Sequence, residues 1–160
     1  MPSSRQPPMG ILRRSTLVVF INQTNEELCL EKESLWLQGV WAADMVPPSS
    51  ILAGESGLWQ SESTGAGRGT GGSVAYYIAG GSSKQLVHIL WKNPLLSRSC
   101  SQGSVRPKGF ELQVLRGWGL HSTVIFIFRM SDHLTCPRLS IMQLTSFLLS
   151  GKIVRHITSS

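Results

Sequence analysis

A tryptophan, a glycine-rich segment and a strand-like run follow one another between residues 57 and 78, and this order restricts the fold more than any other part of the chain. Glycine adopts positive φ angles and lets two backbones approach closely, so the glycine-rich segment favours a flexible turn. Residues 73–78 read Ser-Val-Ala-Tyr-Tyr-Ile, and such β-branched and aromatic residues are typical of a strand. The stretch predicts a small all-β module that presents aromatic side chains and flexible loops to a partner.

The composition agrees with short strands and many turns. The 160 residues include 16 glycines and 8 prolines, which suit turns better than long helices. A chain of this length is expected to form one domain and to bury a hydrophobic core. The net charge is +6, which allows attraction to nucleic acid or to anionic membranes. The basic residues occur singly or in pairs and form no basic stripe, so we expect no nucleic-acid partner.

Runs with strand character occur throughout residues 14–129, which we expect to form the folded domain. These runs are 15–22, 28–30, 35–41, 73–79, 86–91, 110–115 and 123–128. The first two flank a turn cluster and predict a hairpin, and 73–79 with 86–91 predict another. Residues 97–109 are rich in Ser, Gly and Pro and predict a polar loop, and residues 57–59 are expected beside a turn. Seven short strands at close spacing predict an all-β fold, an antiparallel β-sandwich.

The two ends of the chain depart from this pattern. Residues 1–13 are polar and proline-rich, which is typical of a disordered leader. Residues 130–160 are basic and apolar, and they predict either a short helix on the sandwich or an extension that is not native sequence. The apolar run 17–21 is too short for a signal peptide, and no run is long enough to cross a bilayer. We therefore expect a soluble protein, either cytoplasmic or secreted without a conventional signal.

The motifs that would indicate an enzyme are incomplete. Residues 67–72 match the spacing Gly-x-Gly-x-x-Gly, but a strand follows them where a dinucleotide site needs a helix. His121 precedes Ser122 in the sequence, and a catalytic triad would need a third group as well. The chain contains no Cys-x-x-Cys pair, so we expect no metal site. The sequence predicts a protein that is not an enzyme and needs no cofactor.

The three cysteines leave two interpretations open. Cys29, Cys100 and Cys136 are widely spaced. They are either free thiols in a reducing compartment or, in an exported protein, one disulfide with one thiol left over.

The aromatic side chains fall into two groups. The phenylalanines lie inside strand-like runs and predict the core. The tryptophans and tyrosines lie mostly at strand ends or beside Gly and Pro, so they either cap the core or form a patch for a membrane interface or a sugar ring. The candidate contact residues are Trp41, Trp59, Tyr76, Tyr77, Trp91 and Trp118. Arg68, Lys92 and Arg98 are basic residues that would add attraction to anionic lipid.

The order of several short motifs resembles that in a known family. The motifs include Gly-Val-Trp at 39–41, Gly-Leu-Trp-Gln-Ser-Glu-Ser at 57–63, Val-Ala-Tyr at 74–76 and Ile-Leu-Trp-Lys-Asn-Pro at 89–94. Together they resemble the small aegerolysin-like cytolysins of fungi and bacteria, in particular the insecticidal crystal-protein-like branch. The actinoporins, another membrane-active β-sandwich family, have similar spacing.

The resemblance implies a non-enzymatic antiparallel β-sandwich that binds membrane lipids, often sphingolipid-containing. In some members of the family it implies permeabilisation together with a partner protein. A cytolysin-like lipid-binding protein is therefore the first hypothesis. A lectin-like module that binds carbohydrate or protein on the same scaffold is the alternative. Either module could act with a protein partner or as a homo-oligomer.

Overall fold

Strands make up most of the folded chain. The computed structural model describes residues 13–80 and 85–131, and within these ranges it contains strands β1 to β11 and one 3-10 helix, η1. The strands are β1 (Ser15–Asn22), β2 (Leu28–Leu30), β3 (Trp36–Gln38), β4 (Val40–Trp41), β5 (Ser50–Ile51), β6 (Ser56–Glu62), β7 (Thr70–Ile78), β8 (Leu86–Asn93), β9 (Cys100–Val105), β10 (Phe110–Arg116) and β11 (His121–Met130), and η1 spans Lys32–Ser34. No helix in these ranges is long and apolar enough to cross a membrane.

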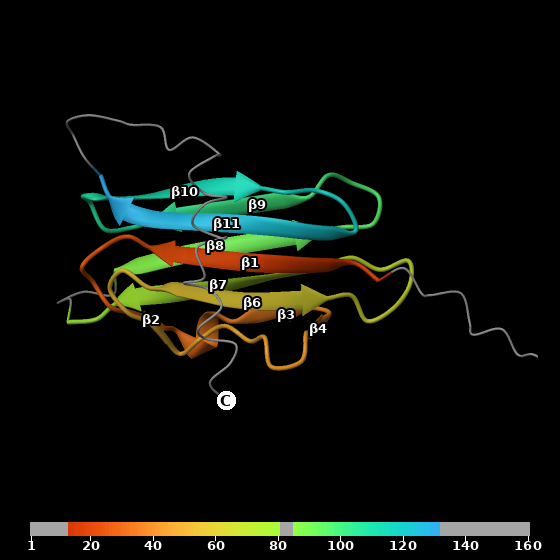
Figure 1. Cartoon of the computed structure of the whole chain (residues 1–160), viewed down its shortest axis with the longest axis horizontal. Helices are drawn as coiled ribbons and strands as arrows, with labels where there is room; N and C mark the ends of the chain where they lie inside the picture. The colour runs from red at the N-terminus through yellow and green to blue at the C-terminus, as the bar shows by residue number, and fades with distance from the viewer. Residues whose placement is uncertain (1–12, 81–84, 132–160) are drawn as a thin grey trace, which may run out of the picture. The chain divides into compact units, whose positions relative to one another are not determined.

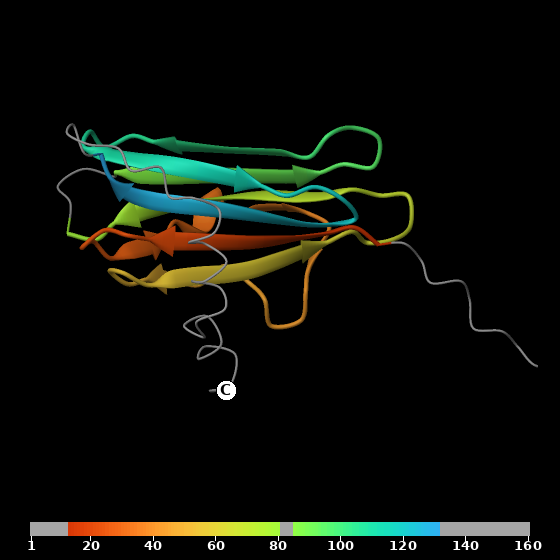
Figure 2. The ribbon, with the colours of Figure 1, turned by 45° about the horizontal axis from the view of Figure 1, so that its top comes forward.

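The strands form two sheets that pack face to face (Figures 1 and 2). One sheet has the order β10-β11-β1-β6-β4. The other has the order β5-β2-β7-β8-β9, and β3 pairs with a separate part of β7. Most neighbouring strands are antiparallel, but β1 and β11 are parallel, with Ser15 opposite His121. The predicted all-β sandwich is therefore confirmed, and it contains one parallel pair that the sequence did not reveal.

Aromatic rings fill much of the space between the two sheets. Along β6 the burial alternates, and Trp59 points inward with none of its surface exposed. Its ring centroid lies 6.0 Å from that of Trp91, which comes from β8 in the facing sheet. Phe20 of β1 makes a similar contact with Tyr76 of β7 at 5.9 Å. Offset and tilted ring pairs of this kind add to the stabilisation that burial of the rings provides.

The glycines at the start of β7 let its backbone lie close to Trp91. A Cβ atom on Gly72 would lie 2.5 Å from Cζ2 of Trp91, and one on Gly71 would lie 2.7 Å from the carbonyl oxygen of Trp91. Gly71 and Gly72 belong to β7, whereas the sequence predicted a flexible turn at these glycines. The glycines serve packing here as well as flexibility.

The strand predictions succeed where the periodicity is regular. The hairpin between 73–79 and 86–91 is confirmed, because β7 and β8 pair antiparallel. The runs 110–115 and 123–128 also pair, as β10 and β11. The run 35–41 is divided at Gly39 into β3, which pairs with β7, and β4, which pairs with β6.

Three local predictions are wrong. The runs 15–22 and 28–30 do not form a hairpin, because β1 and β2 belong to different sheets. Residues 57–59 lie inside β6, where they pair with β1. The predicted loop 97–109 contains β9, a strand of Ser, Gln and Gly residues that pairs with β8. Its residues have low strand propensity, so the pairing with β8 rather than the local sequence determines its structure.

Most residues of the two predicted terminal segments lie outside the described ranges. These segments are the expected leader, 1–13, and the expected extension, 130–160. Of the three cysteines, Cys29 and Cys100 are free thiols, and Cys136 lies outside these ranges.

Candidate binding site at the loop end

Several connections lie at the end of the sandwich where β1 begins. They are the segments 63–69, 94–99 and 117–120, together with residues 13–14 before β1. The pairings of Ser15 with Glu62 and His121 place these connections at one end of the strands, on the right in Figure 1. We call these segments, with the strand residues that adjoin them, the loop end.

One buried side chain holds the loop end together. Asn93, the last residue of β8, has none of its surface exposed. Its Nδ2 donates hydrogen bonds to the carbonyl oxygens of Ser15 at 3.1 Å, Gly119 at 3.1 Å and Leu120 at 3.3 Å. A single amide therefore ties the start of β1 to the connection between β10 and β11.

The oxygen of the same amide binds the other connection. Oδ1 of Asn93 accepts hydrogen bonds from Nη1 of Arg14 at 2.9 Å and from Oγ of Ser99 at 3.4 Å. Nη2 of Arg14 also donates to the carbonyl oxygen of Leu95 at 3.1 Å. Because buried polar groups must be paired, this network holds the backbone of the segments 94–99 and 117–120 in place.

Large apolar side chains project from this ordered backbone. Leu96 is 95% exposed and Trp118 is 85% exposed. Val40, Leu95 and Leu120 lie at the same end of the strands with about two fifths of their surface exposed (43%, 42% and 37%). Several exposed apolar side chains at one end of a folded domain are typical of a surface that contacts a partner.

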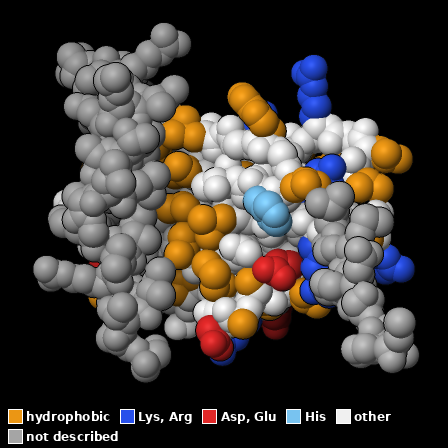
Figure 3. All heavy atoms as spheres, turned by 45° about the vertical axis from the view of Figure 1, so that its right-hand side comes forward, with side chains coloured by type: hydrophobic (Ala, Val, Ile, Leu, Met, Phe, Trp, Pro, Cys, Tyr) orange, Lys and Arg blue, Asp and Glu red, His pale blue; other side chains and the backbone are white. Residues whose placement is uncertain are grey.

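Basic residues lie at the same end of the strands as these apolar side chains. The basic residues on or beside the loop-end segments are Arg13, Arg14, Arg68, Lys92, Arg98 and Arg116. Among the described residues, Glu62 is the carboxylate at this end of the strands. Figure 3 brings this side of the molecule forward, and hydrophobic and Lys or Arg side chains lie next to one another in its upper right part. The loop end is thus both apolar and positively charged.

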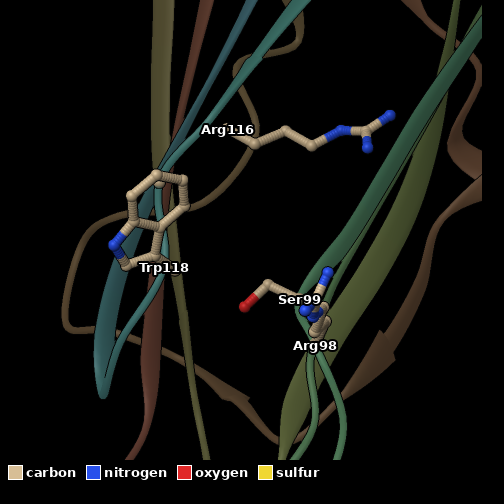
Figure 4. Close-up of a pocket in the computed structure, with 5 residues that line it drawn as sticks. Arg98, Ser99, Arg116 and Trp118 are labelled. Atoms are coloured by element: carbon tan, nitrogen blue, oxygen red, sulfur yellow. The ribbon is translucent and has the colours of Figure 1, made fainter.

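A hollow of about 480 Å³ opens beside Trp118. Arg98 and Ser99 line it from the connection between β8 and β9, and Arg116, Gly117 and Trp118 line it from the end of β10 (Figure 4). The backbone N–H of Gly117 donates to the carbonyl oxygen of Thr123 at 2.7 Å, and a Cβ atom on Gly117 would lie 2.8 Å from that same oxygen. Only glycine, which has no Cβ atom, allows this close approach. The contact holds the backbone next to Trp118 in place.

The structure divides the sequence-predicted contact residues into three groups. Trp118 and Arg68 are exposed at the loop end. Trp41 and Tyr77 are partly buried, and the ring centroid of Trp41 lies 6.1 Å from that of Trp91.

Trp59, Tyr76 and Trp91 form the third group and are 0% exposed. Nε1 of Trp91 donates to Oγ of Ser61 at 3.0 Å, and the hydroxyl of Tyr76 donates to the carbonyl oxygen of Pro48 at 3.0 Å. Burial raises the pKa of the Tyr76 phenol, so this hydroxyl stays protonated. The three rings are core residues, because strand alternation points them inward, and we remove them from the candidate contact residues.

The sequence analysis missed Leu96 and Arg116 as candidates. Leu96 lies just before the predicted polar loop 97–109, and the apolar pair Leu95-Leu96 beside that loop is a signal that could have identified it. Arg116 ends a regular strand, and only the fold shows that it faces the connection between β8 and β9.

The loop end also contains a serine close to a histidine. Oγ of Ser15 and Nδ1 of His121 lie 2.8 Å apart, and Oγ1 of Thr16 lies 3.0 Å from Oγ of Ser122. Within residues 13–80 and 85–131, no carboxylate hydrogen-bonds to His121, and no three His, Cys, Asp or Glu side chains are grouped to hold a metal ion. A catalytic triad needs an orienting third group, so this contact alone does not define one.

Solved structures with a similar fold include two proteins. One is the lipid-binding protein Nakanori, with a TM-score of 0.61 and 16% identity over 75% of this chain and 71% of that one. The other is the RahU protein in complex with a TRIS molecule, with a TM-score of 0.59 and 16% identity over 76% of this chain and 98% of that one. The sequence matches no protein-family model and no curated protein. At this identity the likeness establishes the β-sandwich fold that the three chains share.

Proposed function

We propose that this protein binds lipid membranes through the loop end. The observation that carries the proposal is the exposure of Leu96 (95%) and Trp118 (85%) at the same end of the sandwich as Arg68, Arg98 and Arg116, which form no ion pair with another described residue. The likeness in fold to a protein described as lipid-binding supports the same function. The resemblance of the motifs to aegerolysin-like proteins points in the same direction.

The chemistry of each side chain suits a bilayer surface. Burial of a leucine side chain in an apolar environment contributes about 1.5–3 kcal/mol. Tryptophan favours the headgroup region, where its ring is shielded from water and its N–H stays hydrated. Each Lys or Arg near an anionic leaflet adds about 1 kcal/mol. Two apolar anchors and several cations together are enough for reversible binding to a membrane.

Co-sedimentation with vesicles tests the proposal. Leu96→Ser and Trp118→Ala should weaken binding to vesicles of mixed phosphatidylcholine and anionic lipid, while the fold stays intact. Leu52→Ser is the matched control, because Leu52 is a 47% exposed leucine in the connection between β5 and β6, away from the loop end. Equal loss in all three variants, or no sedimentation of the wild-type protein with any vesicle, would reject the proposal.

The sequence hypothesis of a cytolysin makes a finer proposal. If the protein permeabilises membranes, sphingolipid-containing vesicles loaded with a dye should leak after the protein binds. Homo-oligomers on the vesicle, seen by chemical cross-linking, should accompany the leakage. Binding without leakage would restrict the function to lipid recognition or would require a partner protein.

The hollow beside Trp118 favours one alternative. An exposed indole next to polar Ser99 and two arginines could stack on a sugar ring while the polar groups orient its hydroxyls. A glycan array tests this lectin-like function. A selective glycan signal from a protein that does not sediment with vesicles would favour it over the membrane proposal.

A further inference from the structure

Two arginines face the same hollow from different parts of the fold. Arg98 lies in the connection that leads into β9, the edge strand of one sheet, and Arg116 ends β10, the edge strand of the other. Figure 4 shows the Arg116 side chain extending from the end of β10 toward the other sheet, and Arg98 and Ser99 lying on the connection that leads into that sheet. Both arginines line the same cavity of about 480 Å³ with Trp118.

Neither arginine has an anionic partner in the described part of the chain. The ion pair found there joins Arg129 to Glu111, near the start of β10 and therefore at the opposite end of that strand. The described residues that line the hollow include no carboxylate. Two like charges that share a cavity repel each other, and an anion between them would remove that repulsion.

From this geometry we propose that Arg98 and Arg116 form a clamp for a phosphate monoester, as in the headgroup of phosphatidic acid. A guanidinium group presents parallel N–H donors that match two phosphate oxygens. A phosphate monoester carries a charge of about −1.5 to −2 near pH 7, which two arginines balance.

The position of the clamp fits a headgroup rather than an acyl chain. Trp118 lines the hollow and is 85% exposed, so a bilayer that receives its ring would bring headgroup phosphates to the level of the arginines. A phosphatidylcholine headgroup carries its own cation and has no net charge, so it would gain less from the pair. The lipid source of the phosphate rests on the proposed membrane function, whereas the clamp itself needs only the two arginines.

Vesicle binding by a double variant tests the clamp. Arg98→Gln combined with Arg116→Gln should weaken binding to phosphatidylserine vesicles about thirtyfold through the loss of general attraction, since each cation contributes about a factor of five. The same variant should lose more than this on phosphatidic acid vesicles of equal surface charge, because the clamp contacts are lost as well. The matched control combines Arg13→Gln with Arg68→Gln, which removes two exposed cations from the loop end outside the hollow. This control should weaken binding to both vesicles equally.

The same loss for both double variants on both lipids would overturn the clamp, because it would show only general attraction between charges. That result would leave the membrane proposal standing. Calorimetric titration with glycerol 3-phosphate tests the clamp without a membrane, and wild-type protein should bind while the Arg98→Gln, Arg116→Gln variant should not. Binding of glycerol 3-phosphate without binding to any vesicle would support the clamp for a soluble phosphate and reject the membrane function. The clamp would be rejected if the Arg98→Gln, Arg116→Gln variant lost no more on phosphatidic acid than on phosphatidylserine and wild-type protein did not bind glycerol 3-phosphate.

Discussion

The loop end and the opposite end of the sandwich are held together in the same way, yet their surfaces differ. Asn93 ties the loop-end connections, and Asn22 has the same role where β1 ends. Nδ2 of Asn22 donates to the carbonyl oxygens of Glu26 at 2.7 Å and Leu52 at 3.0 Å. Its Oδ1 accepts from the backbone N–H of Thr24 at 3.1 Å and from the Thr24 hydroxyl at 2.7 Å. Each end therefore has a buried asparagine that satisfies several loop groups.

The charges at the opposite end are mixed. Its described residues include the carboxylates Glu26, Glu27, Glu55 and Glu111 and the cations Arg106, Lys108 and Arg129. Glu111 and Arg129 are paired with each other. At the loop end the cations stand beside exposed Leu96 and Trp118. A buried asparagine holds the connections in place at both ends, so stability does not require the exposed apolar and basic side chains of the loop end. Binding to a partner explains that surface better.

Replacing the two asparagines should give the largest effects. Asn93→Ala removes the hydrogen-bond partner of the Gly119 carbonyl and of the Arg14 guanidinium Nη1, and Asn22→Ala removes that of the Glu26 carbonyl and of the Thr24 N–H, at about 1–3 kcal/mol per group. We expect each variant to lose roughly 3 kcal/mol in the free energy of unfolding, measured with urea. Vesicle binding of the folded fraction should fall only for Asn93→Ala. Weaker binding by Asn22→Ala than by Asn93→Ala would contradict the assignment of the site to the loop end.

Removing the exposed tryptophan should change binding without changing stability. Trp118→Ala should weaken vesicle binding about tenfold, which corresponds to a loss of about 1.4 kcal/mol. Its free energy of unfolding should stay within about 0.5 kcal/mol of the wild-type value, since the ring has few neighbours. Trp36→Ala is a control at a 47% exposed tryptophan on β3, in the six-stranded sheet. A comparable loss of binding in this control would show that the contact surface includes the sheet.

Salt should distinguish the cations at the loop end from its apolar anchors. Raising the salt concentration from about 0.1 M to about 1 M shortens the Debye length from about 10 Å to about 3 Å. Binding to anionic vesicles should therefore weaken severalfold, and a salt-insensitive part due to Leu96 and Trp118 should remain. Binding that does not change with salt would exclude a role for the arginines.

Breaking the ion pair at the opposite end should have the smallest effect. The side chains of Arg129 and Glu111 are 26% and 45% exposed, so solvent screens their attraction. Glu111→Gln should cost less than about 1 kcal/mol in the free energy of unfolding and should leave vesicle binding unchanged. A measurable loss of binding would mean that the opposite end also takes part.

The fold was predictable wherever the local sequence and the tertiary structure agree. β1 and β10 were found because β-branched and apolar residues mark them, and the β7–β8 hairpin was found because its turn is short and rich in Gly and Ser. β9 was missed because its residues are as polar as those of a loop and only its pairing with β8 holds it. The parallel pairing of β1 with β11 joins residues about a hundred positions apart, and no local pattern encodes it.

The binding site was predictable only in part. Trp118 was identified because it stands between two glycines and has no strand to bury it. Trp59 and Trp91 were wrongly predicted as contact residues, because the alternation that points their rings into the core depends on strand register. Arg116 was missed because its partner across the hollow comes from the other sheet. The exposed Trp118 ring was therefore predictable from the sequence, but the residues that lie around it were not.

Quenching of tryptophan fluorescence by brominated phospholipids tests the central claim most directly. The account predicts that vesicle-bound wild-type protein is quenched, that Trp36→Ala is quenched to the same extent, and that the quenching disappears when the bound protein carries Trp118→Ala. Quenching that persists unchanged in Trp118→Ala would show that another face of the sandwich enters the bilayer and would contradict the account.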